Sequence, residues 1–423
     1  MIALLKRIYH KLSRFAIVRW MGKIYLNGSP LSNYMAYRRV RRLAKKTHNH
    51  DGRIKVAFIG QCVAVWGKTA PIYEAMSQDD RFTTVIFAVK DITDTEHNDT
   101  AAYFRGKYDN VIAVGSDGKE DGVSIKEWGP DYVFFTRPYD QYLPKEYRSH
   151  KIAEFAKACY FSYSFMLTYN SLSFSFPKCF ARNLSVFFAE NEYLRKYNEE
   201  RFKVSHRKGI RKSVFLGYPI MERFQPRKRE EKIPWFSILW TPRWQTSDEI
   251  GGSSFFDYKD SIVKMCEEGN SIRLIFRPHP LTFSNFIKTG EMTENEVGEY
   301  LSQFTGERKL YDRSGDYAQT FENADVMLSD ISSMIPEFYI SQKPIIYCER
   351  GAQVLPVISR LLEGCYVSHS WEETEEYIRQ LSNGKDPLKE KRSRICDEVF
   401  GKDLNSITVN VMELIVKDCM DRS

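Results

Sequence analysis

Three apolar runs in the second half of the chain are followed by side chains that suit phosphate chemistry. They are Thr241 and Arg243 after "WFSILW", Arg277 and His279 after "IRLIF", and Asp330, Ser332 and Ser333 after "ADVMLS". Hydroxyl, guanidinium and imidazole groups all donate hydrogen bonds to anionic oxygens. If a helix begins near Ser332, its free backbone N–H groups and its positive end add to the same site. The pattern therefore predicts a cradle for the phosphate groups of an anionic ligand.

Each of these residues also has a plain structural interpretation. Asp330 or Ser332 could cap a helix, and Glu337 could be an ordinary acid in the first turn. Arg277 could be a charge at the end of a strand, and His279, between two prolines, a turn residue. The occurrence of all three motifs at successive strand ends favours the functional interpretation, because ligands of open α/β sheets bind at the carboxyl ends of strands.

The segments that must position these side chains alternate between strand-like and helix-like patterns. "RIKVAFIG" at 53–60 opens a first series of apolar runs, and "WFSILWTPR" opens a second. Such alternation is typical of parallel sheets covered by helices. The charged segment 221–234 contains two prolines and lacks apolar periodicity, which is typical of a linker. We predict an α/β protein with an arm at 1–50, Rossmann-like domains at 51–220 and 235–423, and a cleft between these two domains.

Several common catalytic motifs are absent from the sequence. There is no G-x-G-x-x-G after the first strand, no G-x-x-x-x-G-K-[ST], no G-x-S-x-G and no H-E-x-x-H. The eight cysteines are scattered and form no C-x-x-C pair, so we expect reduced thiols in a cytosolic protein. We therefore expect no cofactor and no built-in metal site.

The positive charge is concentrated at the N-terminus. Residues 1–46 contain twelve Lys and Arg and no Asp or Glu, and the formal net charge of the whole chain is only +7. The body is thus acidic, which argues against a nucleic-acid binder. Apolar residues at helical spacing from Leu5 to Ala16, with Trp20 and the cluster "YRRVRRLAKK", predict a basic amphipathic arm on an anionic membrane surface. The alternative is a helix that packs on its own protein and exposes a basic face.

The motifs "TPRW", "RPHP" and "SDISSMIPEFYISQKPIIYCE" resemble those of the CDP-glycerol glycerophosphotransferases, which build teichoic acids and related polyol-phosphate polymers. The resemblance implies a GT-B fold, a peripheral position on the inner face of the cell membrane, and a CDP-activated polyol donor held by the C-terminal domain. It implies that Arg243, His279, Ser332 and Ser333 contact the donor diphosphate. It also implies that Asp330 organises this corner and that Glu337 binds the ribose.

The reaction expected from this resemblance is the transfer of glycerol phosphate, or a similar polyol phosphate, to a membrane-associated glycan or polymer, with release of CMP. Family members carry a histidine in an "HG" motif, which is absent here. We assign the general base to Asp140 instead, and acceptor binding to Lys68 and Tyr163. Two alternatives remain: a GT-B glycosyltransferase that uses a nucleotide sugar for capsule or surface polysaccharide, and a membrane-associated binding protein without catalytic activity.

Overall fold

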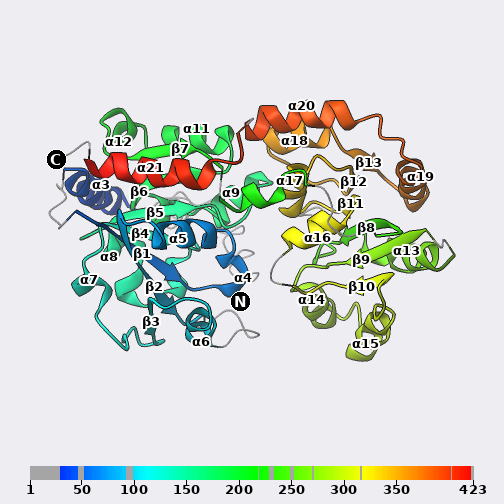
Figure 1. Cartoon of the computed structure of the whole chain (residues 1–423), viewed down its shortest axis with the longest axis horizontal. Coiled ribbons are helices and arrows are strands. Elements are labelled where there is room, and N and C mark those ends of the chain that lie inside the picture. Colours follow the sequence, from blue (N-terminus) through cyan, green and yellow to red (C-terminus); the bar gives the residue numbers. More distant parts are fainter. Residues whose placement is uncertain are drawn as a thin grey trace, which may run out of the picture. The chain divides into compact units, whose positions relative to one another are not determined.

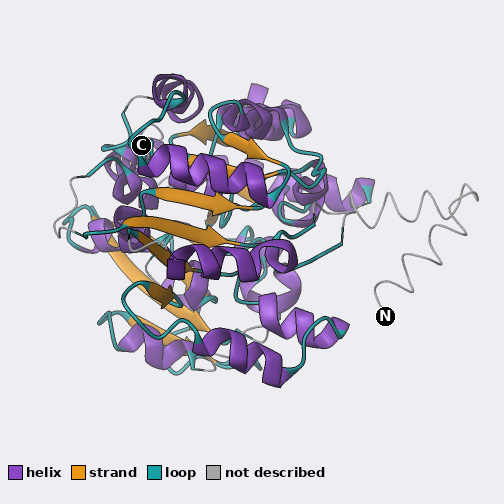
Figure 2. Ribbon diagram, turned by 90° about the vertical axis from the view of Figure 1, so that its right-hand side faces the viewer, coloured by secondary structure: helices purple, strands orange, loops and turns teal. Residues whose placement is uncertain are grey.

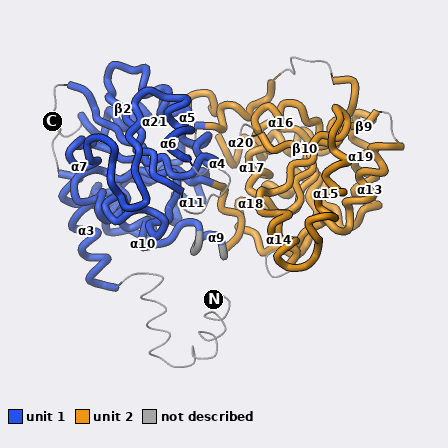
Figure 3. The backbone as a smooth tube through the Cα atoms, turned by 90° about the horizontal axis from the view of Figure 1, so that it is seen from below, with its two compact units in different colours: residues 1–163, 170–219, 408–423 blue, residues 164–169, 220–407 orange. Residues whose placement is uncertain are grey.

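The computed structural model describes residues 29–45, 52–91, 99–217, 219–227, 233–247, 252–268, 271–314, 317–401 and 403–420. Figure 1 shows the labelled helices and strands. The chain divides into two compact units, which Figure 3 colours separately. Unit 1 comprises residues 1–163, 170–219 and 408–423, and unit 2 comprises residues 164–169 and 220–407.

Unit 1 is built on a parallel sheet with the strand order β3-β2-β1-β4-β5-β6-β7. Its strands are β1 (Ile54–Gly60), β2 (Phe82–Val89), β3 (Val111–Val114), β4 (Tyr132–Phe135), β5 (Lys157–Phe161), β6 (Leu184–Ala189) and β7 (Lys212–Phe215). The central strands are almost continuously apolar and buried, as parallel strands covered on both faces must be.

The helices of unit 1 are short apart from the first, α11 and the last. They are α3 (Pro30–Ala44), α4 (Val63–Trp66), α5 (Ala70–Ser77), α6 (Thr100–Arg105), α7 (Ile125–Trp128), α8 (Ser149–Ile152), α9 (Tyr169–Phe174), α10 (Lys178–Ala181), α11 (Glu192–Arg201), α12 (Lys203–Arg207) and α21 (Ile407–Met420), with 3-10 turns at Asp140–Tyr142 and Lys145–Tyr147. A further 3-10 turn, Pro219–Phe224, lies where the chain passes into unit 2. Helix α5 packs on β2, and α11 packs on β6 and β7. Figure 2 shows the helices, strands and loops of the chain in separate colours.

Unit 2 contains a second parallel sheet with the order β10-β9-β8-β11-β12-β13. Its elements are β8 (Phe236–Thr241), α13 (Phe255–Glu268), β9 (Ile272–Phe276), α14 (Thr282–Thr289), α15 (Glu294–Ser302), β10 (Lys309–Tyr311), α16 (Ala318–Asn323), β11 (Val326–Ser329), α17 (Met334–Tyr339), β12 (Ile345–Cys348), α18 (Pro356–Leu362), β13 (Tyr366–Ser368), α19 (Trp371–Ser382) and α20 (Lys389–Phe400). The aromatic side chains of Trp240, Phe255 and Phe276 pack together at the centre of its core.

The second domain begins and ends at other residues than the sequence predicts. Residues 408–423 belong to unit 1, not to the second domain, because α21 returns to the first sheet. There the Asp418 carboxylate accepts hydrogen bonds from Tyr132 and Lys157, which begin β4 and β5. Unit 2 begins at Ile220, and it also includes the short segment 164–169 that follows β5.

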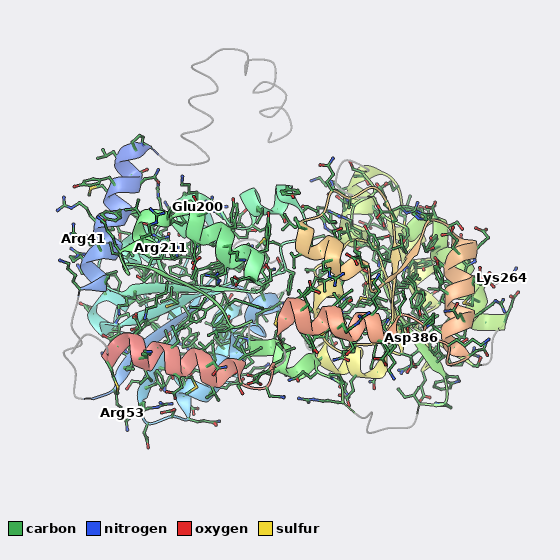
Figure 4. The ribbon with its side chains drawn as sticks, turned by 90° about the horizontal axis from the view of Figure 1, so that it is seen from above. Arg41, Arg53, Glu200, Arg211, Lys264 and Asp386 are labelled. Atoms are coloured by element: carbon green, nitrogen blue, oxygen red, sulfur yellow. The ribbon has the colours of Figure 1, made fainter. Side chains whose placement is uncertain are left out.

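The described part of the basic arm is a helix that packs on unit 1. Helix α3 buries Ala36, Val40 and Leu43 along one face, and this face lies against β6. Arg42 donates a hydrogen bond to the Glu154 carbonyl. Figure 4 labels Arg41 on the exposed side of this helix. Residues 30–44 thus follow the alternative interpretation, a packed helix with a basic face, while the Leu5 to Ala16 stripe and Trp20 lie outside the described residues.

Candidate functional site

The three phosphate-binding motifs predicted from the sequence lie at neighbouring strand ends of unit 2. Strand β8 pairs in parallel with β9 on one side and with β11 on the other. The residues after Thr241, Phe276 and Ser329 therefore emerge at the same edge of the sheet. The topology brings together the seven predicted residues at these ends.

Asp330 ties two of these segments together. Its carboxylate is fully buried and accepts the backbone N–H of Arg243 at 2.8 Å. It also accepts the backbone N–H of Ser254, at 3.0 Å to each oxygen. Burial raises the pKa of this carboxyl, and the N–H groups of Arg243 and Ser254 oppose the rise. Asp330 therefore fixes the backbone of the "TPRW" turn, and its role in donor binding stays a prediction.

Three side-chain atoms at the end of β8 are buried without a hydrogen-bond partner among the described residues. They are Nε1 of Trp240, the hydroxyl oxygen of Thr241, which is 3% exposed, and Nε of Arg243. Burial also lowers the pKa of Arg243, although Asp330 and Tyr347 act in the opposite direction. A buried polar atom without a partner is costly, and an anionic ligand at this edge would offset the cost.

His279 is a neutral hydrogen-bond donor beside Arg243. The backbone N–H of Leu281 donates to its Nδ1 at 3.1 Å, which leaves the ring proton on Nε2. The protein atoms around the ring, and then the positive charge of Arg243, lower the pKa of His279 to about 4. The residue as a whole is exposed, and the centroid of its ring lies 5.8 Å from that of the Trp244 ring. At neutral pH it can therefore donate its Nε2 proton to a ligand oxygen.

Arg277 already has an anionic partner. Its guanidinium forms an ion pair with Asp312 at 2.8 Å, and it donates to the Ser314 carbonyl at 2.8 Å. Both side chains of the ion pair are largely buried. Because Asp312 neutralises its charge, Arg277 is placed to support the site, and direct phosphate binding by Arg277 stays a prediction.

The corner after β11 differs in detail from the expected helix start. Helix α17 begins at Met334, with Ser333 as the residue before it, and the Ser332 hydroxyl accepts the N–H of Met334 at 3.2 Å. Glu337 lies within this helix, is only 1% exposed, and accepts a hydrogen bond from Tyr317 at 2.7 Å. Contacts of Ser332, Ser333 and Glu337 with a donor remain predictions.

The predicted acceptor residues follow neighbouring strands of unit 1. Lys68 is buried and follows β1, Asp140 follows β4, and Tyr163 follows β5. The Tyr163 hydroxyl lies 2.8 Å from that of Tyr139. Asp140 accepts both the backbone N–H and the hydroxyl of Ser149 at 2.7 Å, and burial raises its pKa. A raised pKa suits a base, but these bonds also give Asp140 a structural role at the start of α8.

Sequence reasoning missed several residues that shape the site of unit 2. Ser254 supplies an N–H to Asp330, Asp312 pairs with Arg277, and Tyr317 holds Glu337. Asp312 directly follows the run "KLY", so a strand-end acid was a visible signal. Tyr317 carried no such signal, because it lies in a connection before α16 and its partner is twenty residues away.

The described residues contain no group of three or more His, Cys, Asp or Glu side chains arranged to hold a metal ion. In that same part of the chain, no helix is both long and apolar enough to cross a membrane.

Two parallel sheets covered by helices constitute a GT-B-like α/β fold, as comparison with solved structures shows. A histidine-to-asparagine variant of the wall teichoic acid polymerase TagF, soaked with CDPG, matches with a TM-score of 0.56 and 14% identity over 96% of this chain and 97% of that chain. The S. aureus MnaA–UDP complex matches with a TM-score of 0.57 and 12% identity, over 88% and 98% of the two chains. The UDP-GlcNAc 2-epimerase from Neisseria meningitidis bound to UDP-GlcNAc matches with a TM-score of 0.54 and 11% identity, over 86% and 100%. Identities this low establish the fold alone.

Part of the chain matches a known family model. Residues 187–352 match the family described as CDP-Glycerol:Poly(glycerophosphate) glycerophosphotransferase, which confirms the resemblance inferred from the motifs. The matched segment includes all eight donor-site residues predicted in unit 2. No curated protein matches the chain significantly.

Proposed function

We propose that this protein transfers glycerol phosphate, or a similar polyol phosphate, from a CDP-activated donor to a glycan or polyol-phosphate polymer and releases CMP. The observation that carries the proposal is the edge of unit 2 where the unpartnered Thr241 hydroxyl and Arg243 Nε lie at the strand end next to that of His279. The match to the glycerophosphotransferase family supports this choice of donor.

Unit 2 would hold the donor diphosphate with Arg243 charged and His279 neutral, the states that they already have at neutral pH. The cation of Arg243 would face the phosphate oxygens, and neutral His279 would donate its Nε2 proton to one of them. As the acceptor hydroxyl attacks phosphorus, negative charge moves onto the departing CMP, and both groups would stabilise it. Asp330 would act indirectly, because it fixes the backbone that carries Arg243.

Unit 1 would bind the acceptor. Lys68 and Tyr163 would contact it, and Asp140 would remove the proton of the attacking hydroxyl, since burial raises its pKa toward the range in which a carboxylate is a useful base. The acceptor would be membrane-associated, and the basic segment 1–46, including the exposed face of the packed helix α3, would face the anionic inner side of the cell membrane. The exposed cations of α3 support this placement.

The function is tested by incubating the purified protein with CDP-glycerol, CDP-ribitol and a panel of nucleotide sugars, including CMP-linked sugars, and identifying the released nucleotide. CMP release from a CDP-polyol, with the polyol phosphate recovered on the acceptor, is the expected result. Release of UDP or another nucleoside diphosphate would instead identify a glycosyltransferase. Absence of turnover with every donor would favour a binding protein.

A further inference from the structure

Tyr317 connects two of the predicted donor-site residues. Its hydroxyl donates to Oε2 of Glu337 at 2.7 Å. The Arg277 guanidinium lies over the same ring, 5.4 Å from its centroid. Glu337 is on α17, and Arg277 directly follows β9, so a single side chain from the connection before α16 contacts both.

The ring of Tyr317 has a fixed place. Its centroid lies 5.5 Å from that of Phe224 and 5.2 Å from that of Phe321. Phe321 in turn packs edge to face against Phe338, the residue after Glu337. The aromatic contacts therefore position the hydroxyl independently of its hydrogen bond.

The Arg277 side of this connection is also fixed. Asp312 forms the ion pair with Arg277 and accepts the Thr320 hydroxyl at 2.5 Å. Burial opposes ionisation of Asp312, but Arg277 and then Thr320 and Ser314 keep its pKa below its usual range. Asp312 is consequently charged at neutral pH, and it holds the guanidinium over the tyrosine ring.

A buried carboxylate is oriented by the donors it accepts from. Glu337 is 1% exposed, and the Tyr317 hydroxyl is a neutral donor that leaves its negative charge in place. A carboxylate held in this way is well suited to accept hydrogen bonds from a pair of sugar hydroxyls.

We propose that Tyr317 is a positioning residue for nucleoside recognition: it holds Glu337 so that the site selects a ribonucleotide donor over its 2′-deoxy counterpart. This inference rests on the proposed function, because it assumes that the donor nucleoside binds beside Glu337. It goes beyond the proposed function because it assigns the choice between ribose and 2′-deoxyribose to the Tyr317 hydroxyl, and Tyr317 is not one of the predicted donor-binding residues.

The test measures the affinity of the full chain for CMP and for 2′-deoxy-CMP by calorimetry. The variants are Tyr317→Phe, which keeps the ring, and Glu337→Gln, with Tyr300→Phe as control. Tyr300 is a buried tyrosine of the same unit. Its hydroxyl donates a long hydrogen bond, of 3.5 Å, to the Lys259 carbonyl. Thermal melting of each variant monitors folding.

Wild-type protein should bind CMP more tightly than 2′-deoxy-CMP. Because a hydrogen bond to a charged group is lost, Tyr317→Phe should weaken CMP binding about tenfold and leave 2′-deoxy-CMP binding within about threefold. Glu337→Gln should do the same, and the double variant should lose little more than either single variant. In turnover, Tyr317→Phe should raise KM for the CDP donor and leave kcat within about twofold.

Equal losses for the two nucleotides, or a Tyr317→Phe variant that behaves like Tyr300→Phe, would overturn the proposal and leave the proposed function standing. A wild-type protein that binds neither nucleotide would overturn the proposed function itself, and the inference with it.

Discussion

The carboxylate of Asp330 accepts the backbone N–H of Arg243 at 2.8 Å, across the edge between the parallel strands β11 and β8. The two residues are 87 positions apart in the sequence. Through this bond the acid that ends one strand determines where the guanidinium after the other strand can lie. The acid in "SDISS" therefore acts on the neighbouring turn rather than on the helix that follows it.

Asp330→Asn should weaken CMP binding at least tenfold and destabilise the fold by about 1 to 3 kcal/mol, since the amide can accept at only one of its two terminal atoms. Calorimetry measures the affinity for CMP, and urea unfolding measures the stability. Asp325→Asn is the matched control, because Asp325 precedes the same strand and accepts the N–H of Ser237 at its opposite end. That variant should lose stability but keep its CMP affinity; equal binding losses would show that any damage to β11 has this effect.

His279→Ala should lower kcat/KM by about ten- to a hundredfold, because a donor to the charged phosphate is removed. His369→Ala, an exposed histidine of the same unit, should have no effect. If His279→Ala turns over like wild type, His279 has no part in the reaction.

The lowered pKa of His279 predicts how the stability of the fold depends on pH. The folded-state value of about 4 lies below the ordinary 6.5, so the neutral ring stabilises the fold above pH 6.5. This contribution should decline as pH falls from 6.5 toward 4. His279→Asn can still accept from Leu281 but cannot be protonated, so its loss of stability over that range should be smaller than that of wild type, as urea unfolding at several pH values would show.

Asp140→Asn should reduce kcat by about a hundredfold and leave KM for the donor unchanged, because the amide cannot remove a proton. Ser149→Ala keeps the acid and removes one of its hydrogen bonds, so its kcat should stay within about fivefold of wild type. A normal kcat in a destabilised Asp140→Asn protein would leave the residue with a structural role alone.

The strand-end residues of unit 2 could be predicted because each apolar run ends at a polar residue, and parallel strands end at a common edge. Which atoms meet at that edge could not be predicted. Asp312 reaches Arg277 from β10, a strand of only three residues, and Tyr317 reaches Glu337 from a connection without periodicity. Helix α21 is a further example, since its apolar pattern predicts a helix but does not indicate which sheet it covers.

The exposed cations of α3 allow a sharper test of membrane binding than deletion of residues 1–46. Deletion removes Val40 and Leu43, which are buried, and should therefore destabilise unit 1. Arg38→Glu with Arg41→Glu changes exposed residues and should weaken binding to anionic vesicles at low salt, by about 1 kcal/mol for each cation lost. Arg207→Glu with Lys208→Glu is the control at another exposed site. Equal effects of the two pairs in vesicle sedimentation would indicate attraction by overall charge, without a defined surface.

Asp418→Asn tests the return of the last helix to unit 1. Its carboxylate accepts from Lys157 at 2.5 Å, Lys212 at 2.8 Å and Tyr132 at 2.8 Å. Loss of its charge leaves the buried Lys157 without its anionic partner and should cost about 3 kcal/mol in urea unfolding at pH 7. Glu413→Gln, on the same helix, breaks only an exposed pair with Arg81 and should cost less than about 1 kcal/mol.

The pH dependence gives this last prediction a second measurement. Burial opposes ionisation of Asp418, but Lys157, Lys212 and Tyr132 lower its pKa well below the ordinary value of 3.8. The folded state thus binds fewer protons than the unfolded state, and the contribution is present above pH 4 and lost as pH falls below it. The stability difference between wild type and Asp418→Asn should therefore shrink between pH 5 and about pH 2. A difference that stays constant over this range would mean that the variant acts through packing and not through the charge of Asp418.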